Sequence, residues 1–133
     1  MELKYDDKSI YLIECKSFFS RLIGFMFKKK INYALLFNKC NSIHTFFMKS
    51  NIDVIMCNKD NKILYYYNNF KKNKIIWPKK NVSKVIELPV DYFDIKIGNE
   101  IKFKMNNWRD NKCDIFVCVI FCFLIKRFYY SSW

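Results

Sequence analysis

Short apolar segments separated by polar residues constrain the fold of this chain more than any other feature. Seven such segments, each four to seven residues long, are rich in Val, Ile, Phe and Tyr, which favour β-strands. A turn of Asn, Lys and Asp at residues 58–61 separates two of them, as expected for a hairpin. We predict strands at residues 9–15, 34–37, 43–48, 54–58, 62–67, 82–88 and 100–104.

One segment has helical periodicity instead. Phe18, Leu22, Phe25 and Met26 recur at the spacing of one helix face, and Ser17 is a candidate N-cap. A chain of 133 residues suits one hydrophobic core, and consecutive strands with short links usually pair antiparallel. We therefore predict a single α+β domain at residues 1–104. Its sheet is expected to be mainly antiparallel, partly closed and barrel-like, with the N-terminal helix across one end. Residues 68–80, rich in Lys and Asn, are predicted to form a mobile loop.

Three groups of residues carry a resemblance to a known family. The helical segment contains Arg21, Gly24 and Met26; the next strands contain Phe47, Met48 and Asp53; and a later turn contains Glu87, Leu88 and Pro89, followed by Gly98. In this order the motifs, which extend over residues 10–103, resemble the small bacterial and archaeal family called domain of unknown function 192. The resemblance implies a fold and no agreed activity. This chain departs from it at Asp91 and Asn99, where the family usually has Gly and Asp.

Composition excludes several kinds of function. The net charge of +12 favours an acidic partner, but the lysines read as dispersed and only three arginines are present, so nucleic-acid binding is not expected. The chain has a single histidine and no Cys-x-x-Cys, so we expect no metal and no cofactor. The charged N-terminal residues do not resemble a secretory signal. We therefore expect a cytoplasmic protein with reduced cysteines.

His44 and Asp53 are the candidate catalytic residues. An imidazole near a carboxylate can form an acid–base pair, although a histidine that lies on the same strand face as Phe46 and Met48 is more often structural.

Arg21, Met48, Glu87 and Trp77 are the candidate binding residues. Arg21, Asp53 and Glu87 lie in apolar segments and need partners if they are buried. We predict that Arg21 pairs with one of the two acids. The pair would either fix the helix on the sheet or bind a ligand beside Met48 and Trp77.

The chain ends in a polar linker and a hydrophobic tail, residues 105–133. An uninterrupted apolar run begins at Ile115 and ends at Ile125. Eleven helical residues reach about 16 Å, which is short of a bilayer core of roughly 30 Å, whereas the aromatic and basic residues that follow suit an interface. Three hypotheses stay open for the tail: membrane contact, packing on the domain or a partner, or a tail without a selected role.

The function expected from these features is that of a non-catalytic binding or accessory module for an unknown ligand or protein. Two alternatives are an enzyme with a His44/Asp53 site near Arg21, and a module whose lysine-rich residues 68–80 bind an anionic surface.

Overall fold

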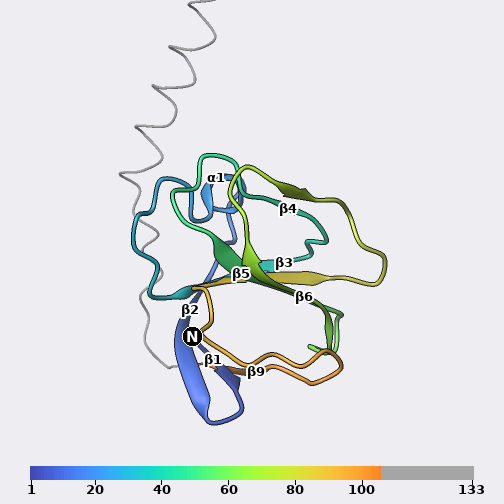
Figure 1. Cartoon of the computed structure of the whole chain (residues 1–133). Coiled ribbons are helices and arrows are strands. Elements are labelled where there is room, and N and C mark those ends of the chain that lie inside the picture. Colours follow the sequence, from blue (N-terminus) through green and yellow to red (C-terminus); the bar gives the residue numbers. More distant parts are fainter. Residues whose placement is uncertain (106–133) are drawn as a thin grey trace, which may run out of the picture.

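The domain is built around one curled, half-barrel sheet. A computed structural model of the chain describes residues 1–105, and Figure 1 shows their arrangement. In chain order the elements are β1 (Glu2–Tyr5), β2 (Lys8–Glu14), α1 (Phe18–Ile23), β3 (Ala34–Asn38), β4 (Ile43–His44), β5 (Ile52–Cys57), β6 (Ile63–Phe70), β7 (Ile75–Ile76), β8 (Lys84–Leu88) and β9 (Lys102–Lys104). Seven strands form the large sheet in the order β6-β5-β8-β3-β2-β1-β9, and β4 pairs with β7.

The large sheet is mixed. β2 and β3 are parallel, and the other neighbouring strands are antiparallel. Parallel neighbours require a crossover connection, which here contains α1. The prediction of a mainly antiparallel sheet is thus right for all pairs but this one. β2 and β3 are not joined by a short link, so the expectation of antiparallel pairing does not apply to them.

The sheet curls far enough to bring its two edges together beside the start of β6. An isolated antiparallel bridge joins Lys62 to Glu100. The Ile63 N–H donates to the Asn99 carbonyl at 2.9 Å, and the Gly98 N–H donates to the Ile63 carbonyl at 2.9 Å. These bonds partly close the barrel.

Both faces of the central strands are buried, and each faces its own hydrophobic core. Every residue of β5 is buried. Ile55, Ile86 and Leu88 belong to one core, which also contains residues of the β1–β2 hairpin, whereas Val54 and Val85 belong to a second core with residues that follow α1. This double burial explains why β5 reads as a continuous apolar run instead of an alternating one.

Three elements differ from the prediction in length. The helix ends at Ile23, because Gly24 has φ 47° and ψ −124°; Phe25 and Met26 are buried beyond it without being helical. The strand expected at residues 43–48 ends at His44. The loop expected at residues 68–80 instead contains the end of β6 and all of β7.

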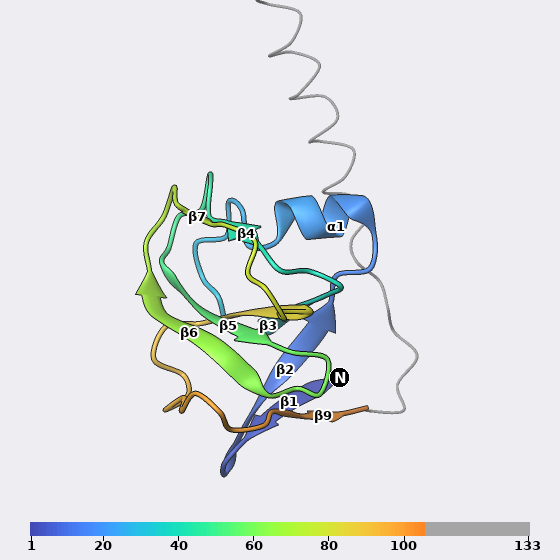
Figure 2. The ribbon, with the colours of Figure 1, turned by 90° about the vertical axis from the view of Figure 1, so that its right-hand side faces the viewer.

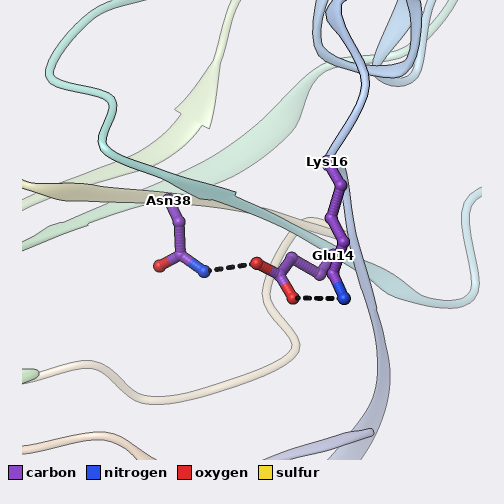
Figure 3. A network of polar contacts seen from close by, with 3 residues as sticks. All are labelled: Glu14, Lys16 and Asn38. Carbon is purple, nitrogen blue, oxygen red and sulfur yellow. Dashed lines mark hydrogen bonds and ion pairs between the residues drawn. The ribbon is translucent and has the colours of Figure 1, made fainter.

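Polar contacts cap the start of α1 and join the strands beside it. The Ser17 hydroxyl accepts from the Ser20 N–H at 3.1 Å, which confirms the predicted N-cap. Just before it, Glu14 accepts from the Asn38 amide at 2.7 Å and pairs with Lys16 at 3.6 Å (Figure 3). Glu14 ends β2 and Asn38 ends β3, so this network joins the C-terminal ends of the two parallel strands.

The hydrophobic tail lies outside the described residues. Within residues 1–105, none of the helices has the length and apolar character needed to cross a bilayer.

Candidate functional site

A cavity of about 530 Å³ lies on the side of the sheet that carries α1, β4 and β7. This volume falls in the range of small-molecule sites. The lining is mostly apolar, with a few polar groups. It consists of Phe18, Arg21, Leu22, Ile23, Gly24, Phe25, Met26, Phe37, Cys40, Ser42, Ile43, His44, Phe46, Met48, Ile75, Ile76, Trp77, Pro78 and Glu87.

Glu87, on β8, is the buried acid of this cavity. It is only 3% exposed. The Phe25 main-chain N–H donates to its carboxyl group, yet burial raises its pKa to about 8. Its Oε2 atom is buried without a hydrogen-bond partner in the described part of the chain. At neutral pH the site therefore holds a mainly protonated carboxyl group, with hydrogen-bonding capacity left unused.

Gly24 gives this carboxyl group its space. A Cβ atom at Gly24 would lie 3.3 Å from both Glu87 carboxyl oxygens and 3.5 Å from the Phe37 ring. Gly24 also has φ +47°, a backbone conformation that disfavours other residues. The turn that ends α1 thus brings the backbone close to the acid, which lets the Phe25 N–H reach it.

His44 contributes a second unused polar atom to the same cavity. Its ring stacks on Phe46, with centroids 5.3 Å apart and planes at 23°. Burial lowers its pKa, so the imidazole is mainly neutral at pH 7. Its Nδ1 atom is buried without a partner. Three such side-chain atoms occur within residues 1–105, and the third, Ser83 Oγ, does not line the cavity.

Arg21 lines the cavity without pairing with an acid. Its guanidinium donates to the carbonyl oxygens of Asn38, at 2.6 Å, and Lys39, at 3.3 Å. The predicted ion pair with Asp53 or Glu87 is absent from the contacts of residues 1–105. Arg21 instead fastens α1 to the end of β3.

Asp53 lies on the opposite face of the sheet from Glu87. Glu87 is paired in register with Val54, so those two side chains share a face, while Asp53 is paired with Leu88 and points the other way. The Asp53 carboxylate accepts from the Tyr66 hydroxyl at 2.8 Å and from the N–H groups of Asn69 at 2.7 Å and Asp91 at 2.9 Å. These bonds lie where the β5–β6 register shifts, between Ile52 and Val54.

The predicted residues therefore separate into two groups. Arg21, His44, Met48, Trp77 and Glu87 all line the cavity. Asp53 does not line it, so the structure does not assemble a His44/Asp53 pair.

Several lining residues were not singled out from the sequence. Phe46 and Ile76 reach the cavity because the chain bends after β4. Thr45, between two lining residues, is buried without lining the cavity itself, and its hydroxyl donates to the Lys71 carbonyl at 2.7 Å and accepts from the Lys74 N–H at 3.0 Å. No group of three metal-ligating side chains occurs among residues 1–105.

The comparisons with known proteins agree with this fold. The family model described as uncharacterized ACR, domain of unknown function 192, matches residues 1–103. The chain belongs to this family. The match includes Arg21, Gly24 and Glu87, which together build one wall of the cavity.

Relatives from Thermococcus species are identical to this chain at about a third of the aligned positions. The UPF0127 protein of Thermococcus sibiricus is 33% identical over 102 residues, a match that covers 70% of this chain and 66% of the relative. The UPF0127 protein of Thermococcus kodakarensis is 38% identical over 80 residues, 56% of this chain and 50% of the relative. The chain thus spans between half and two thirds of the length of these two relatives.

Two solved structures share the fold. A protein of unknown function from Novosphingobium aromaticivorans has a TM-score of 0.64 at 12% identity, covering 77% of this chain and 82% of its own. A putative transcription regulator from Sinorhizobium meliloti has a TM-score of 0.65 at 14% identity, covering 76% and 89%. Both are similar to this domain in fold alone.

Proposed function

We propose that the domain is a non-catalytic binding module and that its ligand occupies the cavity beside Glu87. One observation carries this proposal: two of the three unpartnered buried side-chain atoms in residues 1–105, Glu87 Oε2 and His44 Nδ1, belong to residues that line the same cavity. An unpaired buried polar atom costs the folded state about 1–3 kcal/mol. A ligand that supplies the missing hydrogen bonds would recover part of that cost.

The lining indicates the chemistry of the ligand. Its apolar residues favour a compound, or an apolar side chain of a partner, whose body is aliphatic or aromatic. The two polar atoms favour a head group with hydrogen-bond capacity, such as a hydroxyl, an amide or an amine. In this proposal α1 lies across one end of the sheet and roofs the cavity, and Arg21 holds it there through β3.

The contacts favour binding over catalysis. The acid–base pair predicted from the sequence needs Asp53 within hydrogen-bond reach of His44. Asp53 cannot take this role, because its oxygens are engaged by Tyr66, Asn69 and Asp91 on the other face of the sheet.

A ligand-observed NMR screen of the full chain tests the proposal. The library contains small alkyl and aryl compounds in matched pairs, with and without a hydroxyl, amide or amine head group. We expect hits to carry a head group and to bind at least tenfold more weakly to Glu87→Leu, which removes the polar group and keeps an apolar side chain. Glu100→Leu, at an exposed glutamate, is the matched control and should bind as the unmodified chain does. Equal binding of each pair to all three proteins would refute the proposal.

A further inference from the structure

The net positive charge of this protein arises from two segments of its sequence that contain no acidic residue. Residues 15–51 contain seven Lys or Arg, residues 68–81 contain five, and neither contains an Asp or Glu. The remainder of the chain has twelve residues of each sign, so these two segments carry the whole net charge of +12. Lysines also occur throughout the remainder of the chain, so the absence of acids is what distinguishes these two segments. A lysine-rich composition explains how many lysines there are, but not why the acids avoid these segments.

The two segments come together at one end of the domain. They contain α1, β4 and β7, which lie on the side of the molecule away from the β1–β2 hairpin and β9 (Figure 2). Hydrogen bonds join their loops. The Phe27 N–H donates to the Phe47 carbonyl at 3.1 Å, and the Phe47 N–H donates to the Asn73 side chain at 3.3 Å. We call residues 15–51 and 68–81, apart from the buried strand β3, the basic face.

Large apolar side chains are exposed on the same face. Phe18 is 73% exposed, Phe47 65% and Trp77 72%. Phe27 stacks on Phe47, with ring centroids 6.0 Å apart, and both residues have positive φ. A non-glycine residue rarely adopts that conformation, so the chain accepts backbone strain to present two aromatic rings together.

Exposed aromatic rings among lysines, without acids, match the surface of an anionic bilayer. Lysines beside a membrane are attracted to anionic headgroups, while Phe, Ile and Trp side chains insert at the interface. A nucleic acid fits less well, because bidentate contacts to bases and phosphates rely on arginine. The only arginine of the basic face, Arg21, already donates to two carbonyl oxygens.

We propose that the basic face docks peripherally on a membrane that contains anionic lipids. Phe18, Phe47, Ile75 and Trp77 enter the interface, and the lysines around them, such as Lys28–Lys30 and Lys71, Lys72 and Lys74, contact the headgroups. This inference does not rest on a ligand in the cavity, although Phe18, Ile75 and Trp77 also line it.

Trp77 provides a local test in the full chain. Trp108→Phe and Trp133→Phe leave Trp77 as the only tryptophan, so that its fluorescence reports on the basic face and not on the tail. The probes are vesicles of 30% phosphatidylglycerol in phosphatidylcholine, with brominated acyl chains, and vesicles of phosphatidylcholine alone. We expect a blue shift and bromine quenching of Trp77 with the anionic vesicles at low salt. The blue shift and the quenching should both be absent with the neutral vesicles. With the anionic vesicles both should decrease as salt is added.

Charge reversals at the two ends provide the control. Lys71→Glu, Lys72→Glu and Lys74→Glu together should weaken vesicle binding roughly 100-fold, from about fivefold per lysine. The matched triple Lys96→Glu, Lys102→Glu and Lys104→Glu makes the same change in net charge at positions away from the basic face. It should weaken vesicle binding far less. The proposal is overturned if the two triples behave alike, or if the chain binds vesicles without a Trp77 signal. It is also overturned if Trp77 responds to single-stranded RNA and not to vesicles.

Discussion

Glu87→Gln should change how the stability of this domain depends on pH. The ordinary pKa of this carboxyl group is 4.5, and burial raises it to about 8. Between these values the folded state keeps a proton that the unfolded state has released. Because the folded state then binds more protons, the free energy of unfolding falls as pH rises through this range.

The magnitude follows from the two pKa values. Each pH unit between 4.5 and about 8 removes about 1.4 kcal/mol of stability. Complete ionisation of Glu87 therefore costs the folded state roughly 5 kcal/mol, and at pH 7 roughly 3 kcal/mol is already lost. This is a large part of the 5–15 kcal/mol that stabilises an ordinary domain. The Glu87→Gln substitution keeps the size of the side chain and removes the group that ionises.

Urea denaturation of the full chain at pH 5, 7 and 9 measures the effect. We expect the unmodified chain to lose several kcal/mol more than Glu87→Gln as pH rises from 5 to 9. Glu100→Gln, at an exposed position, is the control and should follow the unmodified chain. Parallel curves for the unmodified chain and Glu87→Gln would show that Glu87 ionises in the folded state as it does in water, which would refute the reasoning.

Three further substitutions test other contacts of the domain. As pH falls from 7 to 5, the unmodified chain should lose stability relative to His44→Gln. Burial lowers the pKa of His44, so its protonation opposes folding, and urea melts at both pH values measure the difference. Asp53→Ala should cost about 3 kcal/mol or more in a urea melt, since it removes three hydrogen bonds to a buried carboxylate, whereas Asp60→Ala in the exposed turn should cost less than about 1 kcal/mol. Asp91→Val should cost about 2 kcal/mol in thermal unfolding, because Asp91 has φ 57°, and Asp91→Gly should be close to neutral; equal costs would contradict the strain argument.

Asp91 also shows where a sequence motif and the structure agree. The family usually has glycine in this turn, and Asp91 adopts the left-handed backbone that favours glycine. Its N–H still reaches the Asp53 carboxylate, and its own carboxylate accepts from the Asn68 amide at 2.8 Å. The turn therefore keeps its conformation although the residue has changed.

The strands with strong apolar patterns could be predicted from the sequence, and the short ones could not. β3, β5 and β8 supply the buried centre of the sheet, and their apolar runs marked them. β1 was missed because only Leu3 and Tyr5 of its four residues are buried, which is too short a pattern for periodicity. The helix was extended past Ile23 because Phe25 and Met26 are buried by tertiary packing in a segment that is not helical.

Several residues of the candidate site could be predicted from the sequence, but the partners of their side chains could not. Arg21, Asp53 and Glu87 were expected to need partners if buried, and the two acids are buried. The partner of Arg21 was mistaken because carbonyl oxygens at a strand end leave no mark in the sequence. The separation of Asp53 from Glu87 follows from the register of β5 on β8. A register shift of one residue would place both acids on the same face of the sheet.

Crystals of the full chain soaked with the screened compounds would test the central claim most directly. We expect density in the cavity between α1 and β8, with the head group of the compound within hydrogen-bond distance of Glu87 Oε2 or His44 Nδ1. Compounds that gather on other surfaces, while this cavity stays empty in every soaked crystal, would contradict the claim that it is the binding site.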